Sequence, residues 1–374
     1  MRRSDERCPA ARRKPSALDV QGTSLDCAFH GQILALKVIV MPRLVIVFTV
    51  LLATCLASGA DESFARGVTI SCQTWGGEWG RPEMAAAMDE LKGLGANWIA
   101  IHPYAQIRAD GSLGWRQEPE PPHLTRPLAW AKERGIGVML IPHIAYWGSP
   151  FSWRGDIRFE KAEEWNRFFA EYEKWIVEMA RIAEAGGAGR FCVGLEYAHA
   201  EKFTARWRQI IAAVRAVYHG RLSYGANWTN FESVPFWDAL DEIGVLAYFP
   251  LSTVENPNAE QLAAGWEPWL QKLGALSSST GKRILFTELG YNDAIHCAAR
   301  PWEFERASAS AAPLQARCLA VALSLPKRTP WLAGAFLWKW FPDVRSDERE
   351  TFDLRTPLLK RVIAASWNPA AEKP

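Results

Sequence analysis

Two glutamates stand at the carboxyl ends of apolar, β-forming runs. Glu196 closes the run RFCVGLE (190–196), and Glu288 lies near the end of RILFTELGY (283–291). Such a run normally ends in Gly, Asn or Pro, so a carboxylate there needs an explanation. Two carboxylates about 5 to 5.5 Å apart can cleave a glycosidic bond with retention. Each glutamate taken alone could equally be a solvated loop residue or half of an ion pair.

The two carboxylates need different surroundings for that reaction. One must be a protonated acid, which burial or a neighbouring negative charge favours, and the other must stay ionised. Tyr248, near the end of another apolar run, could donate a hydroxyl hydrogen bond that keeps Glu288 ionised. Glu196 follows the apolar residues FCVGL, which favour a protonated acid. We therefore predict that Glu288 is the nucleophile and that Glu196 is the acid and base.

The elements that would carry these residues repeat along the chain. Eight β-forming runs cover residues 67–75, 97–104, 137–144, 190–196, 221–228, 242–249, 283–291 and 334–340. Helical patterns, in which apolar residues recur every three or four positions, lie between or after them. These patterns cover residues 81–95, 159–187, 202–220, 258–276, 314–326 and 356–367.

This alternation predicts the fold class. Continuous apolar runs without two-residue hairpin turns indicate a parallel sheet that is covered on both faces. Eight such units favour a closed (β/α)₈ TIM barrel of class α/β, in a single domain, over an open doubly wound sheet. The first strand is also not followed by a GxGxxG turn, which an open dinucleotide-binding sheet would carry.

In such a barrel the active site lies at the carboxyl ends of the strands, where aromatic, imidazole and amide side chains would meet the two glutamates. The predicted substrate-binding residues are Trp75, His102, His143, Asn227, Trp228, Tyr248 and Trp338. Tryptophan rings stack on the apolar faces of sugars, and this chain has nineteen of them, several times ordinary usage. The alternative is that these tryptophans fill the core and that the two histidines are hydrogen-bonded core residues.

The positions of the remaining tryptophans in the predicted strands and helices indicate where their side chains lie. Trp340 is expected to point the same way as Trp338 but deeper into the loop, whereas six tryptophans in strand starts or helical patterns are expected to pack in the core. Those six are Trp98, Trp130, Trp165, Trp175, Trp207 and Trp237.

The first strand run has no HxH pair, and no CxxC or His-Cys spacing indicates zinc, so we expect neither a metal nor an organic cofactor.

The N-terminal region has the order of a secretory signal. Residues 41–60 contain Met41, one Arg, an apolar run and then small residues, so we predict a signal peptide there and a catalytic domain over 61–374. Residues 1–40 precede this complete signal, and we expect translation to begin at Met41. The segment LLATC also resembles a lipid-attachment motif ending at Cys55, although cleavage after ASGA is favoured. An exported protein, periplasmic or extracellular, is the expectation.

The charge and the cysteines limit the partners. Residues 1–60 carry eight Lys or Arg against four Asp or Glu, and without this net +4 the chain changes from +2 to −2. The slight basicity therefore does not indicate nucleic-acid binding, and no obligate protein partner is evident.

Cys72 and Cys192 lie in apolar runs and are expected to be buried thiols, whereas Cys297 and Cys318 could pair in an oxidising compartment.

The strand-end motifs together resemble a known family. GVMLIPHI, VGLEY, LSYGANW, IGVLAYFPL, FTELGY and GAFLWKW are similar to those of glycoside hydrolase family 113 of clan A. Its characterised members are retaining β-mannanases on a (β/α)₈ barrel. The resemblance extends from about Gly67 to Trp340, and it rests on FTELGY together with a glutamate that ends the fourth strand.

The resemblance implies roles for individual residues. Glu196 would be the acid and base, Glu288 the nucleophile, Tyr248 a contact of the nucleophile and Trp338 the platform under the sugar. The chain departs from the clan pattern at Leu195, where an Asn that binds the sugar 2-hydroxyl usually precedes the acid.

That departure leaves the sugar preference open, because mannose and glucose differ at this carbon, and the contact would have to come from Asn227 or His143. We expect a retaining β-glycoside hydrolase that acts on a polysaccharide or oligosaccharide, with β-1,4-mannan favoured. The alternatives are a β-glucanase or β-glucosidase, a hydrolase of an exopolysaccharide pathway, and a carbohydrate-binding barrel without activity.

Overall fold

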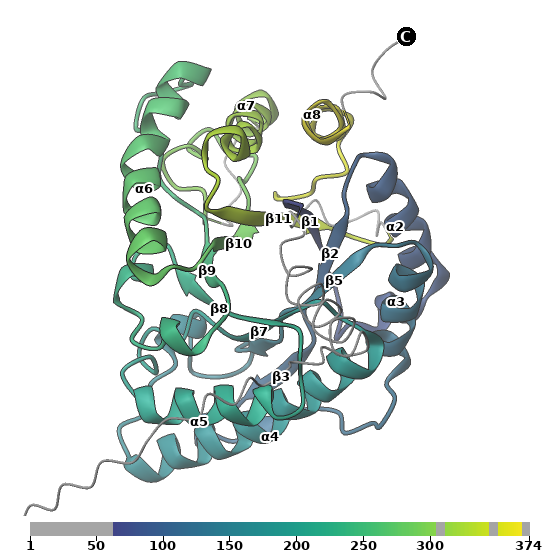
Figure 1. Cartoon of the computed structure of the whole chain (residues 1–374), viewed down its shortest axis with the longest axis vertical. Coiled ribbons are helices and arrows are strands. Elements are labelled where there is room, and N and C mark those ends of the chain that lie inside the picture. Colours follow the sequence, from purple (N-terminus) through teal and green to yellow (C-terminus); the bar gives the residue numbers. More distant parts are fainter. Residues whose placement is uncertain (1–62, 304–310, 344–350, 369–374) are drawn as a thin grey trace, which may run out of the picture. The chain divides into compact units, whose positions relative to one another are not determined.

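The computed structural model describes residues 63–303, 311–343 and 351–368, which belong to one compact unit, Asp61–Pro374. Its centre is a closed barrel of eight strands, which confirms the predicted (β/α)₈ fold (Figure 1). The strands are β1 (Ala65–Ile70), β2 (Trp98–Ile101), β5 (Gly137–Leu140), β7 (Arg190–Leu195), β8 (Arg221–Asn227), β9 (Ile243–Leu246), β10 (Ile284–Leu289) and β11 (Leu332–Trp340). The predicted start at Met41, the signal over 41–60 and the motif at Cys55 lie outside the described residues.

The barrel strands follow one another in chain order around the circle. Their order is β1-β2-β5-β7-β8-β9-β10-β11, and every neighbouring pair is parallel, including β1 with β11. Each of the eight runs identified in the sequence supplies one barrel strand. Because all carboxyl ends meet at the same rim, the residues that follow the strands are brought together.

Seven α-helices cover the outside of the described barrel. They are α2 (Pro82–Gly93), α3 (Pro122–Glu133), α4 (Ala162–Gly186), α5 (Thr204–Arg215), α6 (Ala259–Thr280), α7 (Ala312–Ser324) and α8 (Pro357–Trp367). Six of them were predicted, and α3 was missed. Pro122 suits the first turn of α3, where a missing N–H has no partner to lose, but Pro127 inside the helix interrupts the pattern that would predict it.

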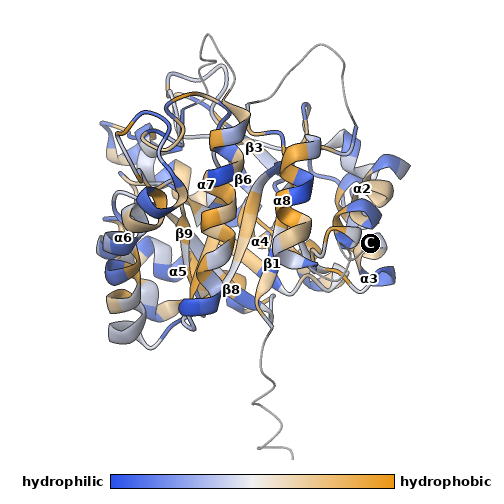
Figure 2. Ribbon diagram, turned by 90° about the horizontal axis from the view of Figure 1, so that it is seen from above, coloured by the Kyte–Doolittle hydropathy of each residue, from blue (hydrophilic) through white to orange (hydrophobic). Residues whose placement is uncertain are grey.

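Two layers of apolar side chains make the core, and Figure 2 shows apolar residues on the central strands and on stretches of α7 and α8. The larger layer lies between strands and helices, and the smaller fills the barrel around Met139, Leu195 and Phe336. Trp165, Trp175, Trp207 and Trp237 are buried as predicted, and Trp98 and Trp130 are partly buried. Leu195, which replaces the clan's usual Asn, is fully buried in the barrel interior.

A small second sheet stands above the rim and was not predicted. It joins β3 (Tyr104–Ile107), β4 (Leu113–Gly114) and β6 (His143–Ala145), with β6 paired in parallel to β3. The register places Tyr104 opposite His143. The predicted runs 97–104 and 137–144 therefore each contain a break, after which the chain enters this sheet.

The opposite end of the barrel contains a buried ion pair. Arg190 binds Glu242 through two hydrogen bonds, Nε to Oε2 at 2.9 Å and Nη2 to Oε1 at 3.0 Å, and both side chains are almost fully buried. The guanidinium also lies 4.3 Å from the centre of the Trp98 ring. Arginine suits this position because its planar fork matches a carboxylate and its flat face stacks on an aromatic ring.

The cysteines are all free thiols in the described residues, so the pairing considered for Cys297 and Cys318 is not formed. The two are nonetheless neighbours, because a hydrogen bond with Cys297 is the largest cause that raises the pKa of the buried Cys318 thiol. Cys192 is buried as expected, whereas Cys72 is partly exposed. Among the described helices, none combines the length and the apolar character needed to cross a membrane.

Candidate active site

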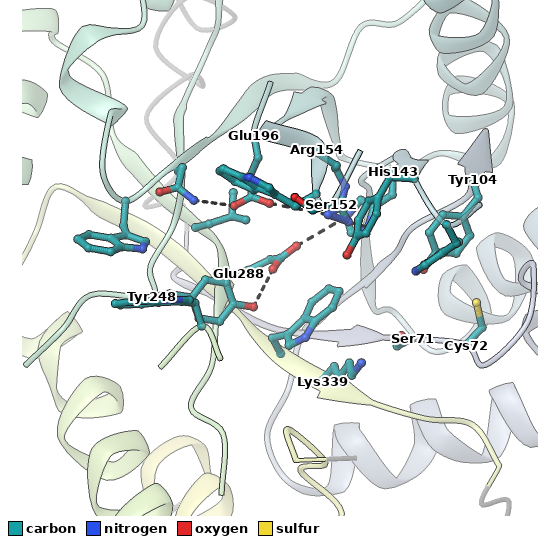
Figure 3. A pocket seen from close by; sticks show the side chains of 18 of the residues that line it. Ser71, Cys72, Tyr104, His143, Ser152, Arg154, Glu196, Tyr248, Glu288 and Lys339 are labelled. Carbon is teal, nitrogen blue, oxygen red and sulfur yellow. Dashed lines mark hydrogen bonds and ion pairs between the residues drawn. The ribbon is translucent and has the colours of Figure 1, made fainter. Parts of the chain in front are cut away.

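The rim encloses one large cavity into which both predicted catalytic glutamates project. Its volume is about 1210 Å³, and Figure 3 shows Glu196 and Glu288 facing each other within it. Glu196 is the first residue after β7, and Glu288 is the fifth residue of β10. Of the predicted substrate-binding residues, the following line the cavity: Trp75, His143, Asn227, Trp228, Tyr248 and Trp338.

Glu196 is held by an amide and a guanidinium. Asn227 Nδ2 donates to Glu196 Oε1 at 2.8 Å, and Arg154 Nη1 lies 3.8 Å from Oε2. The orientation of the Asn227 amide is fixed, because its Oδ1 accepts from the backbone N–H and the hydroxyl of Thr229. Asn227 thus contacts the predicted acid from the neighbouring strand, although Leu195 occupies the position directly before the acid.

Glu288 receives the hydroxyl contact that was predicted for it. Tyr248 Oη donates to Glu288 Oε2 at 2.7 Å, and Glu288 is 5% exposed. The other oxygen, Oε1, lies 3.7 Å from His143 Nε2, which is too long for a hydrogen bond. A tyrosine hydroxyl and an imidazole therefore face the two oxygens of this carboxyl group.

Arg154 determines which ring nitrogen of His143 carries the hydrogen. Its Nη2 is 2.7 Å from His143 Nδ1, and since a guanidinium only donates, Nδ1 must accept. Burial is the main cause that lowers the pKa of His143 well below its usual value, and the charge of Arg154 adds to it, so the ring is neutral. The single ring hydrogen is then on Nε2 and points toward Glu288.

The pKa values of both carboxyl groups are raised. Burial is the main cause for Glu196, and Arg154 and Asn227 oppose it. Burial and then the charge of Glu196 raise the pKa of Glu288 to about 8, against opposing effects of Arg154, Tyr248 and Lys339. The Tyr248 hydrogen bond lowers the pKa of Glu288, which is the predicted direction, but burial and the second carboxylate outweigh this effect.

His102 does not line the cavity and is fully buried behind it. It stacks on His143 with ring centres 4.7 Å apart and meets Trp79 and Tyr104 edge to face. The expected contact with a sugar hydroxyl is therefore not available. Burial lowers the pKa of His102 to about 3, so this ring supports His143 as a neutral, flat neighbour.

The two tryptophans at the end of β11 point to different places. Trp338 lines the cavity and stacks on His143 with ring centres 6.0 Å apart, and it also packs in the barrel interior. Trp340 belongs instead to the layer between strands and helices, near Lys360. The expectation that Trp340 follows Trp338 into the site is wrong, and the peptide bond between Trp338 and Lys339 is cis.

Aromatic rings form two groups at the cavity wall. Trp75, Tyr104 and Trp147 meet edge to face with ring centres 5.1 to 6.0 Å apart, and the two tryptophans are about half exposed. In the second group, Trp228 stacks on Trp302 at 5.0 Å. The first group follows β1, β2 and β5, and the second follows β8 and β10.

Several residues that line the cavity could not be identified from the sequence. Arg154, Trp147 and Trp302 lie in loops, where no periodicity indicates direction, and Lys339 lies inside a strand run that reads as apolar. The only indication in the sequence was the length of the segment that carries Arg154, because it is longer than a turn needs to connect a strand to a helix. Within the described residues, no group of three or more His, Cys, Asp or Glu side chains is arranged to hold a metal ion.

A (β/α)₈ barrel whose rim carries two carboxyl groups in one cavity lined by aromatic rings has the architecture of a glycoside hydrolase. A family model for glycoside hydrolase family 113 matches residues 68–354. The chain belongs to this family.

Solved structures agree with that assignment. The GH113 β-mannanase from Alicyclobacillus acidocaldarius, in complex with ManMIm, is 27% identical, with a TM-score of 0.72 over 83% of this chain and 99% of that one. Two structures of GH113 β-1,4-mannanase, 21% and 22% identical, cover 82% of this chain and 99% of theirs with TM-scores of 0.72 and 0.71, and they show the same fold. No curated protein sequence matches the chain.

Proposed function

We propose that the protein is a retaining glycoside hydrolase that cleaves β-1,4-mannan or a closely related β-linked polysaccharide. The observation that carries this proposal is the pair Glu196 and Glu288, which face each other in one cavity with separate hydrogen-bond partners, Asn227 and Tyr248. A binding protein without activity would need a sugar-shaped surface but would gain nothing from two poorly exposed carboxyl groups that face each other.

In the first step, Glu288 attacks the anomeric carbon and forms a bond to it while the glycosidic bond breaks. Glu196 gives its proton to the departing oxygen, so the leaving sugar is released as a neutral alcohol. Arg154 lies near Glu196 and opposes the raised pKa of both carboxyl groups, so it stabilises the negative charge that is left on Glu196.

In the second step, Glu196 accepts a proton from water as the water oxygen attacks the same carbon. The bond to Glu288 breaks, and the product leaves with its original anomeric configuration. Both residues then return to their starting states, with one proton and one negative charge shared by the pair. The raised pKa of both groups supports one shared proton, whichever of the two carboxyl groups holds it.

The shape of the cavity supports a chain of sugars as substrate. In the barrel order, β7 separates β5 from β8 and β11 separates β10 from β1, so the two aromatic groups lie on opposite sides of the rim. Glu196 and Trp338 come from the separating strands β7 and β11. A chain that stacks on Trp147 at one side and on Trp302 at the other therefore crosses the carboxylates between them, as internal cleavage requires.

The preference for mannan rests on family membership and on the activity printed for the solved relatives. The experiment that tests it is product analysis on β-1,4-mannan, glucomannan, cellulose and mixed-linkage glucan oligosaccharides, with the anomer of the first product followed by NMR. We expect cleavage of manno-configured chains and a β product that appears first. Cleavage of gluco-configured chains alone would refute the mannan assignment, and a first-formed α product would refute retention.

We also propose that the protein is exported through the segment 41–60, since a polysaccharide substrate is met outside the cytoplasm. The N-terminal residue of the mature protein, read from a cell fraction by mass spectrometry, tests this. An N-terminus after ASGA supports cleavage, and a diacylglyceryl group on Cys55 would support the lipid-anchored form instead. Recovery of the uncleaved chain in the cytoplasm would refute export.

A further inference from the structure

The backbone of Glu196 is held in an unusual conformation. Its φ is 58°, in the left-handed region that side chains other than glycine seldom occupy. The Glu196 N–H donates to Gly225 O at 2.8 Å, and the next N–H, that of Tyr197, donates to Tyr224 Oη at 2.8 Å. A side chain on β8 therefore fixes the peptide that directly follows the proposed acid.

The Tyr224 hydroxyl is fixed in turn by a buried carboxyl group. Tyr224 Oη donates to Glu201 Oε1 at 2.8 Å, so the hydroxyl accepts from one group and donates to the other. Tyr224 is fully buried against Trp207 and Phe236. The packing around the Tyr224 ring and the hydrogen bonds to Tyr197 and Glu201 together hold the hydroxyl in one orientation.

The second oxygen of Glu201 leads to Glu196 by another route. Asn230 Nδ2 donates to Glu201 Oε2 at 2.6 Å, and the Asn230 N–H donates to Asn227 O at 3.1 Å. Asn227 Nδ2 then donates to Glu196 Oε1. One carboxyl group is thus connected to both the backbone and the side chain of the proposed acid.

We infer that Glu201 is a positioning residue that acts through Tyr224 and Asn230 to aim Glu196 at the departing oxygen. Glu201 is 5% exposed and does not line the cavity, so it does not touch the substrate. The inference rests on the proposed role of Glu196 as the acid. It also explains why a carboxyl group is buried here, since its two oxygens accept from Tyr224 and Asn230, which contact the Tyr197 N–H and the Asn227 carbonyl.

Its test uses aryl glycosides that differ in their need for an acid. On an aryl β-mannobioside, 2,4-dinitrophenoxide departs without a proton, whereas phenoxide needs one from Glu196. The variants Tyr224→Phe and Asn230→Ala each cut one route, and Tyr218→Phe is the matched control. Tyr218 is equally buried, but its hydroxyl donates to Ala188 O, before β7 and at the far end of the barrel.

We expect Tyr224→Phe and Asn230→Ala to lose about 10-fold in kcat/KM on the phenyl substrate and less than about 2-fold on the dinitrophenyl substrate, because general acid catalysis contributes about 100-fold or more when fully in place. Tyr218→Phe should change kcat/KM by the same factor for the two substrates. The ratio kcat/KM is used because it reports the first bond cleavage, in which Glu196 acts as acid.

An equal loss on both substrates would overturn the inference, because it would show a general effect on the fold rather than on acid catalysis. A Tyr224→Phe variant that behaves like Tyr218→Phe would also overturn it. Failure of the proposed function is distinguishable, since the wild type would then cleave neither the β-mannobiosides nor the corresponding β-cellobiosides, and both the function and the inference would be refuted.

Discussion

At the scale of single residues, the charge balance of the cavity depends on two carboxyl groups and one poorly exposed guanidinium, that of Arg154. Arg154 contacts Glu196 and His143 and lowers the pKa of both carboxyl groups, yet burial keeps those pKa values raised. Its neutral histidine partner then presents an N–H to Glu288. Activity and stability therefore depend on the same few side chains. Substitutions of these residues should change activity and stability by different amounts.

Azide distinguishes the roles of the two glutamates. We expect Glu288→Ala and Glu196→Ala to lower kcat on mannan by about 10³-fold or more while the fold is retained. With an activated aryl mannobioside, azide attacks the free anomeric carbon of Glu288→Ala from the α face, but in Glu196→Ala it displaces Glu288 and gives the β-azide. NMR of the glycosyl azides checks this, and reversed products would exchange the assigned roles.

The raised pKa of Glu288 predicts a pH-dependent effect on stability. A folded-state value of about 8 against an unfolded value of 4.5 means that the stability present below pH 4.5 is lost as the pH rises through 8. Glu288→Gln avoids this loss, so we expect the variant to be more stable than the wild type by up to about 5 kcal/mol at pH 8.5 and by little at pH 4.5.

Urea denaturation at the two pH values measures that difference, with Glu133→Gln on the exposed end of α3 as the control. A difference for Glu288→Gln that does not change with pH would contradict the prediction.

At the scale of elements, the strands were predictable and the loops were not. Strand runs such as RILFTELGY are mostly apolar and lack a regular polar alternation, because both faces of a parallel barrel strand are buried, and this pattern is local. The direction of a loop side chain such as Arg154 depends on contacts with several other segments, which no local pattern records. Trp340 was expected to share the direction of Trp338 because residues two apart in a regular strand lie on one face, but the pairing of β1 with β11 is irregular between Leu337 and Trp340.

The ion pair below the barrel gives a prediction for β7. Glu242→Ala leaves Arg190 buried without its partner, so we expect a loss of about 3 to 5 kcal/mol in the free energy of unfolding, with kcat of the folded fraction unchanged. Asp238→Ala, which breaks the exposed pair with Arg208, should change stability little. Urea denaturation of both variants checks this, and equal losses would contradict it.

At the scale of the whole molecule, the closed barrel brings residues that are far apart in the chain to one cavity at its rim. The sequence predicted the barrel, both carboxylates and Trp228 at the rim, but Trp302 was not found because its loop carries no repeated pattern. The strand order alone places the two aromatic groups on opposite sides. If the proposed function is correct, the length of substrate that the protein favours is a property of the assembled fold.

Substrate length tests this arrangement. We expect Trp302→Ala to raise KM about 10-fold for a mannan oligosaccharide long enough to reach both aromatic groups, because stacking on an exposed ring contributes about 0.5 to 1.5 kcal/mol or more. KM for an aryl β-mannoside with one sugar should be unchanged, which makes the short substrate an internal control. Equal changes for long and short substrates would contradict a groove that extends to Trp302.

The small sheet above the rim has a consequence for how this protein could evolve. Tyr104, in one aromatic wall, and His143, beside Glu288, are register partners on adjacent strands, with ring centres 6.0 Å apart. A mutation that reshapes the wall for a new sugar therefore also shifts the residue that faces the nucleophile. New specificity is more accessible through the loop of Trp302, because the segment of Trp228 also carries Asn227, which holds Glu196. Diversification should therefore be concentrated in the loop after β10.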